Sequence, residues 1–257
     1  MKTILDTSHG WPRDFSWAED GLSCRISPVA GGLGDGLAVL DICSGPLRFS
    51  LLPGRGMGIW KGTCDGYSLG WESPVQGPVH PCHVELERRG GLGWLDGFDE
   101  LLCRCGLAFN GPPGKDANGY PITLHGRIAN LPASSLRILH DKTHHCLIVE
   151  GVVLESSVFD SRLKLTTTYS LPSGSRVLSI WDRVENGASH AAEMQLLYHL
   201  NIGRPFLEKG STLHLPIKSM SPQTEKAAEA IGGWQTYEGP QAGFKEEVYL
   251  FHLRENV

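Results

Sequence analysis

The hydrophobic positions of this chain recur with the two-residue period of half-buried β-strands. In residues 163–171, for example, Leu163 and Leu165 share one face while Lys164 and Thr166 share the other. Such alternation is typical of a strand with one side in the core. Segments of this kind predict strands over residues 37–43, 47–52, 146–154, 163–171, 177–184, 193–200 and 248–253.

Helical patterns are confined to two short segments. Residues 224–231 (TEKAAEAI) predict two turns, and residues 95–102 predict a short helix capped by Asp96. Between the strands the chain is punctuated by 32 Gly and 16 Pro. Many strands with irregular connections and almost no helix predict an all-β fold, a large antiparallel β-sandwich. Because no repeat or low-complexity linker interrupts the sequence, we expect a single domain over residues 1–257.

Composition narrows the classes of partner. With 257 residues, of which 40% are hydrophobic and 20% charged, the chain can bury a sizeable core. Its formal net charge of -5, without basic clusters, argues against nucleic acid or an anionic membrane as partner. We therefore expect a small neutral molecule as ligand, and the sequence leaves open whether the protein forms a homo-oligomer.

The N-terminal residues and the cysteines indicate the cellular compartment of the protein. The first apolar stretch is stopped by Asp6, too early for a signal peptide, and no apolar run is long enough to cross a bilayer. The seven cysteines are an odd number without a C-x-x-C pair, which favours a reducing environment over a disulfide framework. These features predict a soluble, cytoplasmic protein.

Four segments are rich in the residue types that form catalytic and binding sites. Three lie in or beside Gly-rich loops between residues 54 and 126 that are dense in Trp, His, Cys, Asp and Arg. Loops of that composition on a rigid scaffold are where binding residues gather. The four segments are 52–61 (LPGRGMGIWK), 70–84 (GWESPVQGPVHPCHV), 120–133 (YPITLHGRIANLPA) and 198–204 (YHLNIGR).

With these motifs the chain resembles the galactose mutarotase-like superfamily. It is most similar to an uncharacterised bacterial branch of aldose 1-epimerase-like proteins, a domain-of-unknown-function branch (DUF4432-like). The resemblance rests on G-R-G-M, G-W-x-S-P followed by H-P, C-G-L at 105–107, L-H-G-R and Y-H-x-N, and covers residues from about 35 onward. It implies a large antiparallel β-sandwich and a cofactor-free enzyme that interconverts the anomers of an aldose by opening and reclosing the sugar ring.

The resemblance also implies two catalytic histidines, which His125 in LHGR and His199 in YHLN match. His199 is the expected acid toward the ring oxygen, and His125 is expected to orient the sugar and stabilise charge at the ring or anomeric oxygen. Histidine suits proton exchange because its unperturbed pKa is about 6.5. From the residues alone, His125 is equally a loop histidine that bonds the backbone, and His199 a histidine on a sheet face.

Four further residues are candidate sugar ligands. Arg55 and Arg127 offer forks of donors to hydroxyls, Trp71 offers a ring to the apolar face of a pyranose, and Asn201 offers an amide. Arg55 and Trp71 also have purely structural interpretations. The glycines that flank Arg55 are typical of a tight turn, and Trp71 also reads as a packing aromatic beneath its loop.

One feature of the superfamily has no match. In relatives the base is a glutamate in a C-terminal segment downstream of the position matching residues 244–252, whereas this sequence ends at Val257. Glu246 and Glu247 are local candidates. We therefore expect either a domain incomplete at its C-terminus, with a sheet edge or core face uncovered, or another carboxylate as base. The alternative function is a non-catalytic carbohydrate-binding protein that retains the sugar pocket.

The sequence gives weaker support to a zinc site or to a phosphate-binding loop. His80, Cys82, His83, Cys103 and Cys105 offer zinc ligands, but their spacing places neighbours on opposite sides of a strand, so the sequence predicts no metal. The Gly-rich residues 31–36 predict a turn rather than a phosphate cradle, because no helix follows.

The sequence also gives little support to a hydrolase. The sequence has no G-x-S-x-G elbow. Asp96, Asp99 and Glu100 share one loop and could serve glycoside hydrolysis, but they read equally as charges at the start of a short helix.

Overall fold

The computed structural model describes residues 1–8, 10–158 and 161–255. The chain forms two compact units, Met1–Ile202 and Gly203–Val257. The first contains two large sheets and all the candidate histidines and sugar ligands. In the second, one antiparallel strand pair and one helix are described, and the candidate bases Glu246 and Glu247 lie there.

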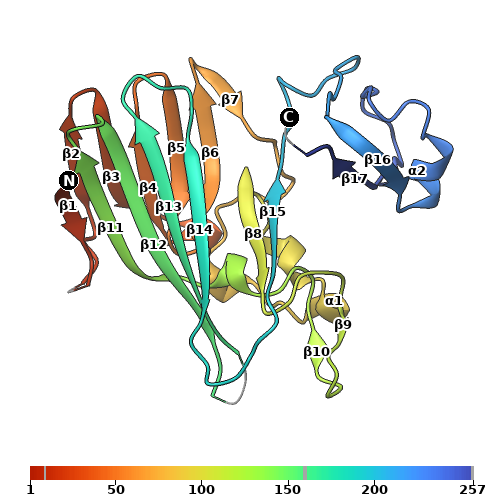
Figure 1. Cartoon of the computed structure of the whole chain (residues 1–257), viewed down its shortest axis with the longest axis horizontal. Coiled ribbons are helices and arrows are strands. Elements are labelled where there is room, and N and C mark those ends of the chain that lie inside the picture. The colour runs from red at the N-terminus through yellow and green to blue at the C-terminus, as the bar shows by residue number, and fades with distance from the viewer. Residues whose placement is uncertain (9, 159–160, 256–257) are drawn as a thin grey trace. The chain divides into compact units, whose positions relative to one another are not determined.

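Two antiparallel sheets build the first unit (Figure 1). The five-stranded sheet has the order β1 (Lys2–Asp6), β11 (Ala133–Asp141), β12 (Cys146–Ser156), β13 (Arg162–Pro172) and β14 (Ser179–Asn186). The eight-stranded sheet has the order β15 (Gln195–Leu200), β8 (Leu102–Leu107), β6 (Gly58–Cys64), β5 (Leu47–Leu52), β4 (Ala38–Cys43), β3 (Leu22–Pro28) and β2 (Phe15–Glu19), with β7 (Tyr67–Leu69) also paired to β6.

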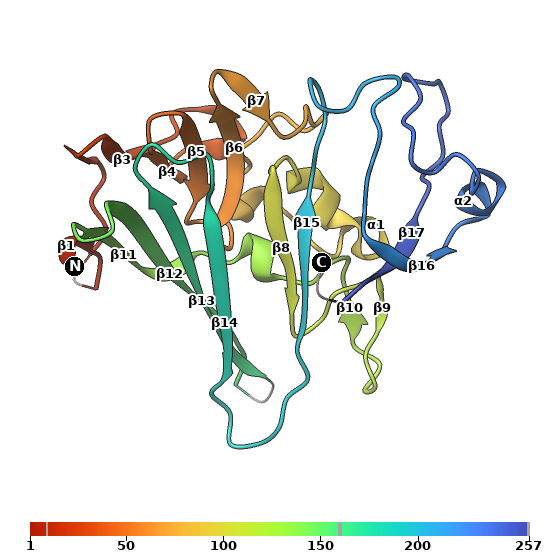
Figure 2. The same ribbon diagram turned by 45° about the horizontal axis from the view of Figure 1, so that its top comes forward.

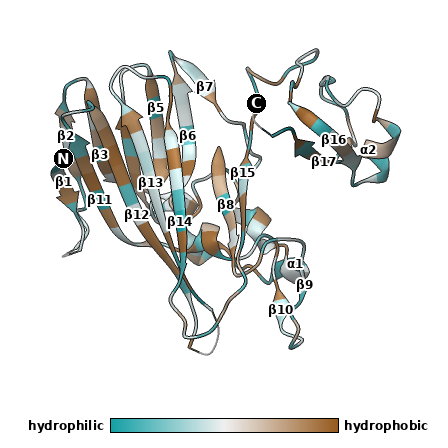
Figure 3. Cartoon of the chain, in the orientation of Figure 1, coloured by the Kyte–Doolittle hydropathy of each residue, from teal (hydrophilic) through white to brown (hydrophobic). Residues whose placement is uncertain are grey.

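The main hydrophobic core lies between these sheets. It joins Leu40 and Leu51 of the eight-stranded sheet to Leu136 and Leu165 of the five-stranded sheet, all fully buried. In Figure 3 brown hydrophobic residues along the strands are interrupted by teal hydrophilic ones, as the two-residue period requires. The predicted all-β antiparallel sandwich is therefore confirmed.

Each strand predicted from the sequence is present, and β5 has the predicted bounds. The sequence did not predict β1, β2, β3, β6, β7, β8 and β11, the two-residue strands β9 (Gly114–Lys115) and β10 (Pro121–Ile122), or β16 (Ile217–Pro222). Strand β8 shows why: all of its residues are buried, so it has no alternation to recognise, and Arg104 interrupts its apolar run. Strand β6 (GIWKGTC) is obscured by two glycines.

The two helix predictions have different outcomes. Helix α2 (Glu225–Glu229) forms where expected, with the Thr224 hydroxyl accepting a hydrogen bond from the Ala227 N–H at 3.1 Å. The helix predicted over residues 95–102 is wrong. A 3-10 turn, η3 (Gly93–Gly97), ends there and the chain extends into β8, while Asp96 pairs with Arg88 and Arg89 instead of capping a helix.

Short elements complete the first unit: η1 (Gly32–Gly34), η2 (Pro81–His83), α1 (Arg88–Gly91), β9 (Gly114–Lys115), β10 (Pro121–Ile122) and η4 (Ile128–Asn130). In the second unit β16 (Ile217–Pro222) pairs with β17 (Tyr249–Leu253), and both are seen beside α2 in Figure 2. The rings of Trp234 and Phe251 pack 4.9 Å apart there. Among the described residues, no helix has the length and apolar character needed to span a membrane.

Candidate active site

Strands β8 and β15 determine which way His199 faces. Arg104 of β8 points toward the five-stranded sheet, where it bonds Tyr169 and Asp182. Cys103, the next residue back, therefore points to the opposite side of the sheet, and it is the partner of His199 in the β15–β8 register. His199 thus lies on the outer face of the eight-stranded sheet.

A small second core covers this outer face. It is made by Trp94, Phe98, Cys103, Cys105 and Ala129, which are buried together. Trp94 and Phe98 come from the loop around η3, and their rings are 4.2 Å apart. The loop therefore supplies an aromatic layer over the strands that carry His199.

The LHGR motif places His125 on a tight turn. His125 has a left-handed φ of 58°, its N–H donates to the Gly111 carbonyl at 2.9 Å, and its carbonyl accepts from the Gly106 N–H at 3.0 Å. The next residue must be glycine, because Gly126 has φ 70° and a Cβ there would lie 2.2 Å from the Phe109 carbonyl oxygen. This strained, doubly anchored turn fixes the imidazole, an arrangement often found at functional sites.

The structure brings the two predicted histidines together. The ring centroids of His125 and His199 are 5.6 Å apart, with an interplanar angle of 76°. Trp94 contacts His125 edge-on at 4.7 Å, and Phe98 contacts His199 edge-on at 4.8 Å. Two residues distant in sequence thus form one aromatic-lined histidine pair.

The surroundings of His125 favour its neutral form. Its Nδ1 lies 3.2 Å from the Asn110 side-chain oxygen, which only accepts hydrogen bonds, so we assign the proton to Nδ1 and leave Nε2 as an acceptor. Burial lowers the pKa of His125, and the charge of His199 lowers it further. The pair therefore contains a histidine that is suited to take a proton near neutral pH.

Trp71 and Asn201 lie at the edge of the same cluster. The Trp71 indole N–H and the Asn201 amide both donate to the Glu100 backbone carbonyl, at 3.1 and 2.9 Å. The Trp71 ring is 5.2 Å from Phe98, which in turn contacts His199. One backbone carbonyl therefore positions both side chains beside the histidines.

The two arginines differ. Arg127 is exposed, two residues after His125. Arg55 is only 1% exposed: it pairs with Glu100 at 2.7 Å and donates to Asn130 and to the carbonyls of Val79 and Gly97. Because these acceptors surround its guanidinium, Arg55 holds the buried Glu100 side chain in place. It could bind sugar hydroxyls only if these hydrogen bonds were broken.

Sequence reasoning missed Trp94, Phe98 and Asn110. Phe98 lies within residues 95–102, for which the sequence predicted a helix, Trp94 lies just before them, and no motif marks Asn110. Their roles depend on contacts between loops, which local pattern does not encode. Of the zinc candidates, Cys103 and Cys105 are buried in the second core, and a hydrogen bond between them together with burial raises the pKa of Cys103.

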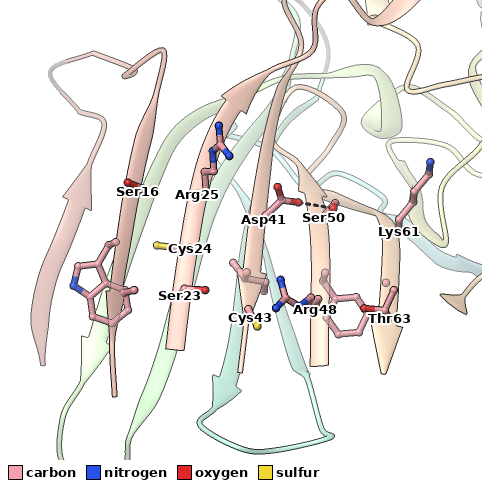
Figure 4. A pocket seen from close by; sticks show the side chains of 15 residues that line it. Ser16, Ser23, Cys24, Arg25, Asp41, Cys43, Arg48, Ser50, Lys61 and Thr63 are labelled. Atoms are coloured by element: carbon pink, nitrogen blue, oxygen red, sulfur yellow. Dashed lines mark hydrogen bonds between the residues drawn. The ribbon is translucent and has the colours of Figure 1, made fainter. Parts of the chain in front are cut away.

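A groove of about 750 Å³ hollows the outer face of the eight-stranded sheet over β2 to β6 (Figure 4). Its polar side chains include Arg25, Arg48 and Lys61, with Asp41 accepting a hydrogen bond from Ser50 at 2.5 Å. None of the site residues predicted from the sequence lines this groove. It is therefore a feature separate from the histidine pair.

The sandwich is that of the galactose mutarotase-like class, as the sequence resemblance implied. The chain belongs to the family of the domain of unknown function DUF4432, whose pattern matches residues 34–257. It is similar in structure to a candidate aldose 1-epimerase from Klebsiella pneumoniae subsp. pneumoniae MGH 78578, with a TM-score of 0.91 and 32% identity over 99% of this chain and 69% of that one.

A second solved structure, the Slr1438 protein from Synechocystis sp. PCC 6803, has a TM-score of 0.47 and 20% identity, over 68% of this chain and 56% of that one. None of the curated proteins matches the chain.

Proposed function

We propose that the protein is an aldose 1-epimerase-type isomerase that acts on a free or modified monosaccharide without a cofactor. The observation that carries this proposal is the contact between His125 and His199, 5.6 Å apart on an aromatic layer. The similarity to the Klebsiella pneumoniae protein, a candidate aldose 1-epimerase, supports the same reaction class.

The reaction needs one base and one acid close to each other. The base removes the proton from the hydroxyl on C1 while the acid protonates the ring oxygen, and the bond between C1 and that oxygen breaks. Rotation about the C1–C2 bond of the open aldehyde and reclosure in the reverse sense give the other anomer. Both protons return, so the reaction consumes no other reactant.

The pair divides these roles between its members. Nε2 of His125 accepts the anomeric proton, because Nδ1 is held by Asn110 and the pKa of His125 is lowered. His199 donates the proton to the ring oxygen, as the resemblance implied. This gives His125 a more direct role than the orienting one expected from the sequence, and a lowered pKa keeps its imidazole neutral and able to act as the base.

The surrounding residues provide a surface for a sugar. Trp71 stacks against the apolar face of the pyranose, and exposed Arg127 binds hydroxyls. Asn201 and buried Arg55 position the cluster through Glu100. The ligand is therefore a small sugar, whose apolar face contacts Trp71 and whose hydroxyl pattern is read mainly by Arg127.

The second candidate is a carbohydrate-binding protein without catalysis. The observation that favours it is the aromatic layer beside Trp71, because a stacking surface can hold a sugar without an acid or a base. Glu246 and Glu247, the local candidates for a glutamate base, precede β17 in the second unit. If His125 cannot serve as base, the aromatic cluster would bind sugar without opening its ring.

Anomeric exchange measured by NMR tests the proposal. Purified protein is added to equilibrated hexoses, pentoses and 6-deoxy sugars, and magnetisation exchange between the α and β anomeric signals is compared with buffer. Faster exchange for one sugar, lost in His199→Ala, is expected. Specific sugar binding by the folded protein with no faster exchange for any sugar would favour the binding protein instead.

A further inference from the structure

His140 on β11 poses a problem of hydrogen bonding. The residue is 0% exposed, and neither of its ring nitrogens has a hydrogen-bond partner among the described residues. A buried imidazole that bonds nothing loses its hydration without replacement, so such a group demands an explanation. His140 lies on a different strand from the histidine pair and takes no part in it.

Two carboxylates face this imidazole. Glu19 Oε2 is 3.8 Å from Nδ1, and Asp20 Oδ2 is 3.7 Å from Nε2. Glu19 ends β2 and Asp20 begins the turn to β3, where it adopts a left-handed φ of 55° and its carbonyl accepts a hydrogen bond from Ser173 at 2.7 Å. The turn therefore holds two acidic side chains over a buried histidine, too far away for hydrogen bonds.

We propose that Glu19, Asp20 and His140 bind a divalent transition-metal ion of the zinc type. One ligand atom from each residue lies within 4.8 Å of the others. Small rotations of the two carboxylates would bring these atoms to the roughly 2.0–2.2 Å from the ion that zinc requires. No other His, Cys, Asp or Glu group in the described part of the chain meets this spacing.

The donor set determines which ion fits. An imidazole nitrogen with two carboxylate oxygens suits Zn²⁺, Co²⁺ or Ni²⁺, whereas Mg²⁺ and Ca²⁺ prefer oxygen alone. Two negative carboxylates neutralise the ion's charge. His140 coordinates through one ring nitrogen, Nδ1 beside Glu19 or Nε2 beside Asp20, and the carboxylate that faces the other nitrogen turns toward the same ion.

The neighbours allow an ion to enter. The carboxylate side chains of Glu19 and Asp20 are 32% and 45% exposed, so the ion approaches from solvent while His140 lies behind them. Lys142 pairs with Glu19 Oε1 at 2.6 Å, which leaves Oε2 toward His140, and the Trp17 ring packs 5.0 Å from the imidazole. The ammonium of Lys142 repels a cation and limits the affinity.

An ion here would join the two sheets of the first unit. Glu19 and Asp20 belong to the β2–β3 turn of the eight-stranded sheet, and His140 belongs to β11 of the five-stranded sheet. Binding to the folded state alone would raise the unfolding temperature. Because this site is separate from His125 and His199, its occupancy and the sugar chemistry are tested independently.

Titration of the whole chain with Co²⁺, followed by visible absorption, tests the proposal. We expect one equivalent to bind with nitrogen and oxygen ligands. A thiolate charge-transfer band would reveal binding to one of the seven free cysteines instead and would count against the proposal. Asp20→Asn, at an exposed turn, and His140→Gln are each expected to weaken binding about tenfold or more.

His144→Gln is the matched control. His144 lies four residues after His140, but on the surface, where it pairs with Asp141 at 2.7 Å. It should bind Co²⁺ as the parent does. The absence of Co²⁺ binding at about 1 mM, some 10³-fold above a micromolar Kd, would overturn the proposal. Equal affinity of the parent and Asp20→Asn would overturn it as well.

Discussion

Asp182 on β14 accepts two hydrogen bonds from the guanidinium of Arg104 on β8, from Nε to Oδ2 at 2.5 Å and from Nη2 to Oδ1 at 2.9 Å. The two side chains are 0% and 1% exposed, and the pair joins the two sheets of the sandwich. Asp182 also accepts a hydrogen bond at 2.8 Å from Tyr198, the residue before His199. The ion pair therefore supports the strand that carries the proposed acid.

Replacing Asp182 with Asn should destabilise the protein by about 3–5 kcal/mol, because it leaves the buried Arg104 charge without its partner. Urea unfolding followed by tryptophan fluorescence measures the change. Glu185→Gln on the same strand is the control. Its exposed ion pairs with Lys164 and Arg183 should contribute about 1 kcal/mol or less. Equal midpoints for the two variants would contradict the structural role of Asp182.

His199→Ala should lower the anomerisation rate by about 10²-fold or more while sugar affinity changes by only several-fold, because a positioned acid acts mainly in the transition state. His125→Asn should have a loss of similar size. NMR exchange gives the rate and titration calorimetry gives the affinity. A rate equal to the parent's in either variant would remove that histidine from the mechanism.

The pH dependence of kcat/KM should report His125. The base must be neutral, and burial and the charge of His199 hold the pKa of His125 below the ordinary value of 6.5. The rate should therefore fall as pH decreases through an inflection below 6.5, and this inflection should be absent from the residual activity of His125→Asn. An inflection that persists in the variant would assign it to another group.

Trp71→Ala should weaken sugar binding by about tenfold, the effect of one stacking ring, whereas Trp71→Phe should retain most of the affinity. Phenylalanine keeps a ring but loses the hydrogen bond to the Glu100 carbonyl, so the two variants separate stacking from positioning. Titration calorimetry measures both. Unchanged affinity in Trp71→Ala would show that the ring does not contact the sugar.

Asp99 should make stability depend on pH. Burial and the nearby charge of Glu100 raise the pKa of Asp99 to about 6, while Oδ2 accepts a hydrogen bond from Trp60 at 2.7 Å. A carboxyl with a raised pKa in the folded state binds its proton more tightly there than when unfolded. Its contribution therefore favours folding at low pH and is lost as pH rises through about 6.

Asp99→Asn, which is neutral at every pH, should stabilise the protein by about 1–3 kcal/mol at pH 8 and much less at pH 5. Urea unfolding at the two pH values checks this. Asp96→Asn, in the same loop but paired with Arg88 and Arg89 near the surface, should show no such gain at pH 8. A gain of equal size at both pH values would rule out the titration of Asp99 as the cause.

The sequence by itself determined the fold class, and its motifs predicted the two catalytic histidines. Strand β13 was predicted because its inward residues, among them Leu163 and Leu165, alternate with outward ones, and that alternation is a local property of the chain. His125 and His199 were predicted because they lie in LHGR and YHLN, short local motifs that carry the resemblance to the superfamily. Helix α2 was predicted from the local pattern of residues 224–231, and the structure adds that Thr224 caps it.

Only the tertiary structure decided what surrounds these residues. Strand β8 was missed because loops bury its outer side as well, which removes the alternation. Arg55 and Arg127 look alike in sequence, yet one is bonded inside the protein and the other faces solvent. Likewise, Glu19 and Asp20 meet His140 across more than a hundred residues of chain. Such contacts depend on how the sheets and loops pack, and no local pattern encodes that packing.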